Sequence, residues 1–200
     1  MTIPVNAPTT ASDPVDAIYE ILSRFKQFED LVVESGETET IPANEAWYVS
    51  GEITIEGELI VEGELINGTV WTLETPEIDY WDDVPHKGKE NRANPAIYVH
   101  SSGADSIDRF SADKGSTHEI ESVLASVWTL GSTDSESRRY ARKYRDDLIR
   151  IAENYMNDNF GDTEFHNIEP IESNDFRGQH LPRQTDHYIY TVEIEAERLR

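Results

Sequence analysis

A six-residue repeat in the first half of the chain restricts the possible folds more than any other feature. Residues 51–68 read as three consecutive hexads, with Gly51, Gly57 and Gly63 in register. A glutamate follows each glycine, and an aliphatic residue stands two positions after each glycine. Glycine at each bend and an aliphatic side chain at each inward position fit the rungs of a β-solenoid. A β-meander with accidental repetition fits equally well, so the sequence leaves both open.

The repeat belongs to a β-rich segment, residues 45–73, which we interpret as an insertion into a larger domain. Three rungs alone bury little apolar surface, so they need to dock on the rest of the chain or on a partner. Residues 1–44 then form an N-terminal arm and helix of the main domain, and residues 74–200 complete that domain. Trp47 and Trp71 bracket the insertion and are expected to cap its core.

Two amphipathic helices are predicted outside the repeat. Asp13 provides a capping carboxylate, proline follows at the first helical position, and apolar residues recur at helical spacing, which predicts a helix over 14–33. Thr133 and Glu136 form a capping box before a second helix that runs from Ser135 to about residue 159.

The last residues alternate between apolar and polar side chains from Tyr188 to Glu197. This period of two predicts a final β-strand with one apolar face and one solvated face. Further strands are predicted at 96–100, at 117–130 with a bulge near Ser122, and around Phe165 and Ile168. Residues 74–95, 102–116 and 170–185 read as loops. The predicted fold class is α+β: a mixed or antiparallel sheet packed by two helices, with a β-rich hexapeptide-like repeat insertion.

The charge balance indicates a high-salt environment. The chain has 40 acidic and 17 basic residues, only five of them lysine, and a formal net charge of -23. Multimolar salt screens such self-repulsion within about 3 Å. The acidic residues spread over the whole chain, which favours a halophilic source, or a virus of a halophile, over an acidic regulatory protein or nucleic-acid mimic. Strong negative charge also makes the chain a poor non-specific DNA binder.

No residue pattern points to catalysis. The chain has no cysteine, and its six histidines stand in no recognised metal-binding spacing. Neither a nucleophile elbow nor a phosphate-binding glycine loop occurs. The neighbouring carboxylates Asp82-Asp83 and Asp146-Asp147 are compatible with catalytic carboxylate pairs, but we favour a halophilic surface. We expect no enzyme activity, metal or cofactor, and neither a membrane span nor a secretory signal is predicted.

One helix concentrates positive charge in this acidic chain. Six of the 17 basic residues lie on the second predicted helix: Arg138, Arg139, Arg142, Lys143, Arg145 and Arg150. These cations either pair with nearby acids, for a few tenths of a kcal/mol per pair, or form an interface with an acidic neighbour. We favour the interface over pairing alone and over a nucleic-acid role.

The order of elements resembles a known family. The order is an N-terminal helix, then Trp81-Asp82-Asp83-Val84-Pro85 and Pro95-Ala96-Ile97-Tyr98-Val99, a strand through Val127-Trp128, the helix 135–158 and the last strand. Outside the repeat, this order is similar to that of the tail-terminator proteins of long-tailed viruses. The resemblance implies a hexameric ring, located in the virion neck and assembled in the host cytoplasm. Such a ring ends tail-tube polymerisation and joins the tube to the head connector, and DNA passes through its lumen without sequence-specific binding.

The resemblance and the acid bias together imply a tailed virus of a haloarchaeon. Its partners are then further copies of itself, the tail-tube protein and the head–tail connector or stopper. The predicted loops 82–95 and 102–116 are the candidates for reaching these partners. Residues predicted at the interfaces, besides the cations 138–145, are Trp81, Asp82, Asp83, Lys87, Lys89 and Arg92. Two alternatives remain: another neck or tail component, and a cellular halophilic binding module that assembles through its repeats.

Overall fold

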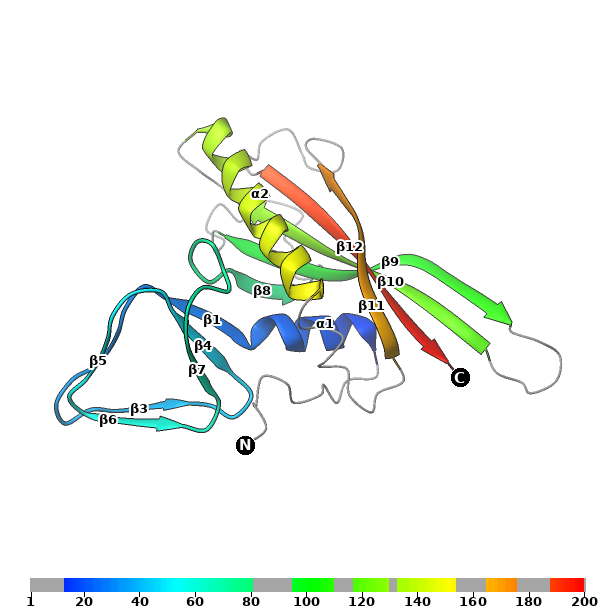
Figure 1. Cartoon of the computed structure of the whole chain (residues 1–200). Coiled ribbons are helices and arrows are strands. Elements are labelled where there is room, and N and C mark those ends of the chain that lie inside the picture. The colour runs from blue at the N-terminus through cyan, green and yellow to red at the C-terminus, as the bar shows by residue number, and fades with distance from the viewer. Residues whose placement is uncertain are drawn as a thin grey trace.

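The computed structural model describes residues 13–80, 95–109, 117–129, 133–153, 165–175 and 188–199 (Figure 1). The fold is α+β, as predicted. Its helices are α1 (Pro14–Ser23) and α2 (Asp134–Ile151). Seven short strands come first: β1 (Phe25–Phe28), β2 (Leu31–Val33), β3 (Thr38–Ile41), β4 (Ala46–Val49), β5 (Ile53–Ile55), β6 (Glu58–Val61) and β7 (Glu64–Asn67). The remaining strands are β8 (Glu77–Tyr80), β9 (Ala96–Arg109), β10 (Thr117–Thr129), β11 (Phe165–Asp175) and β12 (Tyr188–Leu199).

The first helix begins as predicted but ends ten residues early. The Asp13 carboxylate accepts a hydrogen bond from the Val15 N–H at 2.8 Å, with proline at the first helical position. The helix ends at Ser23, so the predicted span 14–33 is wrong. Apolar residues at 25, 28 and 32 match a helical period, but here they lie in β1 and β2. The parallel pairing of β1 with β4 overrides the helical preference of the local sequence pattern in this segment.

Residues 25–67 form a three-sided β-solenoid, which settles the choice left open by the repeat. Coil 1 consists of β1, β2 and β3, coil 2 of β4, β5 and β6, and β7 begins a third coil. Strands stack in parallel as β1-β4-β7, β2-β5 and β3-β6, and Figure 1 shows the triangular outline. A meander would pair its strands antiparallel. Each hexad forms one side of the triangle, so the three hexads complete one turn instead of stacking as three rungs. The stack also begins at Phe25, before the residue 45 expected from the repeat.

The repeated glycines lie where consecutive coils come closest. The Gly57 N–H donates to the Val33 carbonyl at 3.1 Å, and the Gly63 N–H donates to the Ile41 carbonyl at 3.0 Å. A Cβ at either position would lie well within 3.0 Å of two carbonyl oxygens of coil 1. Only glycine fits such close backbone approach, which explains the six-residue period.

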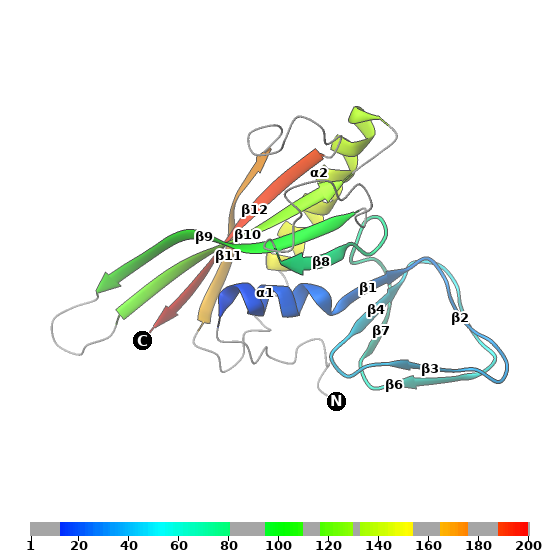
Figure 2. The ribbon, with the colours of Figure 1, turned by 180° about the vertical axis from the view of Figure 1, so that it is seen from behind.

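A five-stranded sheet forms the second part of the molecule, with the order β11-β12-β10-β9-β8. Its pairs are antiparallel except for β8 and β9, which are parallel. The register of β10 against β9 shifts between Glu121 and Val123, which confirms the bulge predicted near Ser122. Figure 2 shows the solenoid at one end of the molecule and the long β9–β10 ribbon extending at the other.

Several predicted loops are strands. β9 continues through residues 102–109 and β11 through 170–175, and β8 lies within the predicted loop 74–95. The polar composition of these segments favours loops locally. Backbone pairing with β10, β12 and β9 overrides that preference.

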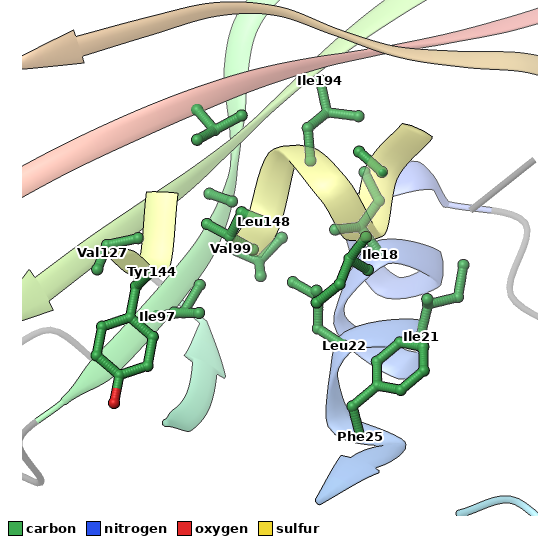
Figure 3. Packing of buried hydrophobic residues seen from close by; sticks show 14 of the residues in the cluster. Ile18, Ile21, Leu22, Phe25, Ile97, Val99, Val127, Tyr144, Leu148 and Ile194 are labelled. Carbon is green, nitrogen blue, oxygen red and sulfur yellow. The ribbon is translucent and has the colours of Figure 1, made fainter. Parts of the chain in front are cut away.

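The main core lies between one face of the sheet and the two helices. Figure 3 shows Ile18 and Leu22 of α1 and Leu148 of α2 in one layer with Val99 and Ile194 of the sheet. All five side chains are buried. On β12 the apolar side predicted from the period of two supplies Tyr190, Val192, Ile194 and Ala196 to this core.

The opposite sheet face is not solvated along its whole length. Ile189 is buried there beside Trp128 and Tyr98, whose rings meet edge to face at 5.6 Å. The Thr191 hydroxyl lies 2.9 Å from the Ser126 hydroxyl in a buried hydrogen bond. The predicted wet face of β12 is therefore wrong at Ile189 and Thr191, because this part of the sheet has a second buried layer.

Candidate assembly surfaces

The outer face of α2 carries the predicted cations. Thr133 caps the helix, accepting a hydrogen bond from the Glu136 N–H at 3.2 Å, which matches one half of the predicted capping box. The inner face is buried through Ala141, Tyr144 and Leu148. Five predicted interface cations lie elsewhere on the helix: Arg138, Arg139 and Arg142 are exposed, and Lys143 and Arg145 are half-buried. The helix therefore presents positive charge away from the core.

Some of these cations are held by local contacts. The Arg145 guanidinium donates to the Asp146 carboxylate at 2.8 and 2.5 Å and lies 5.2 Å from the centre of the Tyr190 ring. Arg139 lies 5.6 Å from the Tyr140 ring. The Tyr140 hydroxyl donates to Glu136 at 2.7 Å, and this hydrogen bond raises the pKa of Tyr140. Exposed pairs of this kind add little stability, but they fix where the charges lie.

Arg150 and Asp147 serve the fold instead of the outer face. The Asp147 carboxylate is buried and accepts hydrogen bonds from the Thr72 N–H at 2.6 Å and the Thr72 hydroxyl at 2.7 Å. Arg150 donates to Asp147 at 2.9 Å and to the Val70 carbonyl. Asp147 was predicted to be halophilic surface, and its burial contradicts that prediction. These contacts attach α2 to the segment that follows the solenoid.

The end of the solenoid formed by coil 2 is a second candidate surface, which sequence reasoning left undefined. Ile55 and Val61 stack over Val33 and Ile41 in the parallel ladders. The lower residues are 1% and 0% exposed, whereas Ile55 is 46% and Val61 49% exposed. Equivalent positions differ because coil 2 covers coil 1. An apolar end therefore faces outward.

Acidic side chains surround this apolar end. Glu56, Glu58 and Glu62 are exposed at the corners of coil 2. Glu64 opens β7 beside them, and partial burial raises the pKa of its carboxyl group. The surface combines an apolar centre with a negative rim, a pattern that suits a contact made in high salt.

A shallow pocket lies between α1 and the sheet, lined in part by Asp13, Asp16, Tyr80 and His100. The Tyr80 hydroxyl donates to Asp16 at 3.0 Å, and the Tyr80 ring stacks on Tyr19 at 4.3 Å. Burial, followed by the hydrogen bond to Asp16, raises the pKa of Tyr80 to about 12. These contacts tie β8 to α1. Among the described residues, no group of His, Asp or Glu side chains is arranged to hold a metal ion.

The remaining predicted interface residues lie outside the described residues. They are Trp81, Asp82, Asp83, Lys87, Lys89 and Arg92. Of the predicted loop 102–116, residues 102–109 belong to β9 and only 110–116 fall between β9 and β10.

Comparison of the sequence with models of known protein families and with characterised proteins finds no match. No helix in the described part of the chain is long and apolar enough to cross a membrane.

Proposed function

We propose that the chain is a structural virion protein that forms a ring at the head-proximal end of a viral tail. In this role it terminates tail-tube polymerisation and joins the tail to the head connector. The source is then a long-tailed virus of a haloarchaeon. The sheet and its two helices form the ring-building domain, and the solenoid lies outside it.

The observation that carries this proposal is the charge separation on the surface. The chain has a net charge of -23, yet the outer face of α2 presents the exposed cations Arg138, Arg139 and Arg142. A basic helix on an acidic chain is complementary to other surfaces of an identical copy. Such a contact joins two different surfaces and repeats from copy to copy, so it closes a ring when the rotation between copies allows.

The order of elements supports the same assignment. The helix α1, the long strands β9 and β10, the helix α2 and the final strand β12 follow one another as in the resemblance to tail terminators. The solenoid is inserted after α1 and before the strands of the five-stranded sheet. At this place it can extend from a ring without interrupting the ring.

The test is the mass of the purified full chain at low and at multimolar KCl, measured by light scattering coupled to gel filtration, with negative-stain imaging. We expect a closed ring of several copies. Arg138→Glu with Arg142→Glu should dissociate the ring, because both side chains are exposed and reversal of their charge replaces attraction by repulsion. Arg138→Lys with Arg142→Lys keeps the charge and should keep the ring. An unchanged ring in the glutamate variant would remove α2 from the contact.

The form of the assembly also distinguishes a tail terminator from the alternative functions. A tail-tube subunit polymerises into long tubes, whereas a terminator stops at a ring. A cellular module that assembles through its solenoid is the second candidate, favoured by the outward-facing apolar end at Ile55 and Val61. Its assembly would survive the α2 charge reversal and would be lost when that end is altered.

A further inference from the structure

The end of the solenoid at coil 2 leaves strand edges as well as apolar side chains uncovered. In the described part of the chain, β5 pairs with β2 and β6 pairs with β3, while the third side continues from β4 to β7. One edge each of β5 and β6 therefore faces away from its stacked partner. We call this surface, with Ile55 and Val61, the open end. Ile60 is exposed for another reason, since its stacked partner Thr40 is exposed as well, which places both on the outer side of the solenoid.

We propose that the open end binds the open end of a second copy of this chain, so that two solenoids pair end to end about a two-fold axis. This contact goes beyond the ring of the proposed function and uses a different surface. It buries the exposed side chains Ile55 and Val61 and pairs the edges of β5 and β6.

The occupant must itself be made of strands. An uncovered strand edge presents a row of N–H and C=O groups that another strand satisfies. At the open end, two such edges lie on adjacent sides of one triangle and enclose an apolar centre. A second open end offers edges and apolar residues with the same spacing, which a helix or an irregular segment does not.

The corners of coil 1 argue against head-to-tail stacking, in which coil 1 of one copy would follow coil 2 of another. In the observed stack, Gly57 and Gly63 make tight corners whose backbone lies against the carbonyl groups beneath. Coil 1 has the wider corners 34–37 and 42–45 at the equivalent places. Ala43 and Asn44 carry a Cβ in one of these corners. The corners of coil 1 therefore suit a coil that is covered by another coil and do not suit one that lies over another coil. Head-to-tail stacking is thus disfavoured, and pairing of two open ends is the arrangement that remains.

Charge sets the conditions under which the open ends pair. Glu56 and Glu62 lie at the corners of coil 2, and Glu58, whose carboxylate accepts a hydrogen bond from the Thr38 hydroxyl of coil 1 at 3.3 Å, opens β6, so two copies bring together two sets of negative charge. At low ionic strength this repulsion opposes the contact, whereas at about 1 M salt it is screened beyond about 3 Å. Pairing therefore strengthens as salt rises. A contact made by the cations of α2 weakens under the same change, because its attraction is screened.

Symmetry places this contact outside a polar ring. A two-fold contact uses the same surface on both copies, whereas neighbours in a polar ring use different surfaces. Open-end pairing therefore joins copies from two rings, or joins copies that are not in a ring.

The experiment measures the mass of the full chain by light scattering across KCl concentrations from low to multimolar. At high salt we expect the unmodified protein to have twice the mass of the double variant Ile55→Glu with Val61→Glu, and this doubling to be absent at low salt. Any weakening of the α2 contact by salt affects both proteins alike, so the comparison at equal salt isolates the open end. The matched control is Val32→Glu, which adds a charge at a residue 57% exposed on coil 1, away from the open end. It should double in mass as the unmodified protein does.

A variant that pairs more strongly than the unmodified protein shows that the loss of pairing in the Ile55 and Val61 variant is not caused by unfolding. Glu58→Gln with Glu62→Gln removes repulsion from the rim and should shift the doubling to lower salt. No doubling in the unmodified protein, or doubling that persists in the Ile55 and Val61 variant, would overturn the proposal. Charge reversal at Arg138 and Arg142 should abolish the ring and leave the salt-induced doubling, so failure of either contact is recognised separately.

Discussion

Replacement of Gly57 by alanine tests how closely the coils of the solenoid are stacked. A Cβ at this position would lie well within 3.0 Å of the carbonyl oxygens of Glu34 and Glu37. Both oxygens belong to the main chain of the coil beneath, so no side-chain rotation relieves the contact. The two corners must move apart to admit the methyl group.

That movement acts on the hydrogen bonds of the same corner. The Gly57 N–H donates to the Val33 carbonyl at 3.1 Å, and the Glu58 N–H donates to the Glu37 carbonyl at 2.9 Å. Overpacking of a dense region costs about 1–3 kcal/mol, and weakening each of two hydrogen bonds costs up to about 1 kcal/mol. We expect Gly57→Ala to lower the free energy of unfolding by about 1–5 kcal/mol.

Thermal unfolding in multimolar KCl measures this loss, which corresponds to a decrease in Tm of about 10 °C for a chain of this size. Amide hydrogen exchange should locate the loss of protection in residues 25–67. Gly63→Ala should behave alike, since its Cβ would meet the Pro42 and Glu45 carbonyls. The control is Gly36→Asn, at φ +89° with nothing within 4 Å of a Cβ, because asparagine tolerates positive φ. Equal Tm values for Gly57→Ala and Gly36→Asn would refute the close stacking.

Two further predictions concern contacts that join the parts of the fold. Asp147→Ala removes the acceptor shared by Thr72 and Arg150 and should lower the free energy of unfolding, measured with denaturant, by about 1–3 kcal/mol. The control Asp146→Ala, at a carboxylate 62% exposed, should change the free energy of unfolding little. Equal effects of the two substitutions would show that Asp147 does not anchor α2. Burial raises the pKa of Tyr144, and burial followed by the Asp16 hydrogen bond raises that of Tyr80 to about 12. The unfolded state therefore ionises first, so stability present below pH 10 should be lost as pH rises from about 10 through the folded pKa. The double variant Tyr80→Phe with Tyr144→Phe should show a flatter alkaline decline, and an equally steep decline would contradict this assignment.

The beginning of α1 could be predicted from sequence, and its end could not. Asp13 and the proline after it act through hydrogen bonds and dihedral angles within one turn, so the signal is local. Phe25 and Phe28 continue the helical spacing, but Phe25 is buried in the main core and Phe28 packs against Trp47 at 4.8 Å. Their strand conformation depends on a pairing with β4, about 20 residues later, which no local pattern reports.

The solenoid could be predicted where one coil lies over another. Gly51, Gly57 and Gly63 belong to the covering coil, and a Cβ at each would meet the coil beneath. Coil 1 covers nothing in the described part of the chain, so its corners are free to carry side chains and its strands show no six-residue period. The same asymmetry hides residues 25–41 from repeat analysis and explains why the predicted segment began at residue 45.

The candidate surfaces were accessible to sequence analysis to different degrees. The exposed cations of α2 follow from helical periodicity alone, because Tyr144 and Leu148 mark the buried face. Helical spacing also places Asp147, three positions after Tyr144 and four before Ile151, beside the buried face, and Asp146 on the opposite side. The hydrogen-bond partner of Asp147, Thr72, is 75 positions away and gives no local signal. The exposure of Ile55 and Val61 depends on where the stack ends, which the aliphatic pattern of the hexads does not show.

The two candidate surfaces respond to salt in opposite directions, and this bears on how one acidic chain can use both. Attraction between the cations of α2 and an acidic neighbour falls as ions screen it, whereas contact between two open ends becomes possible only when their glutamate rims are screened. The burial of Ile55 and Val61 supplies the second contact with an apolar contribution that salt does not remove. In multimolar salt, the environment that we propose, the apolar surface at the open end therefore contributes most, and the contacts of the proposed ring then rest on shape and packing as well as charge.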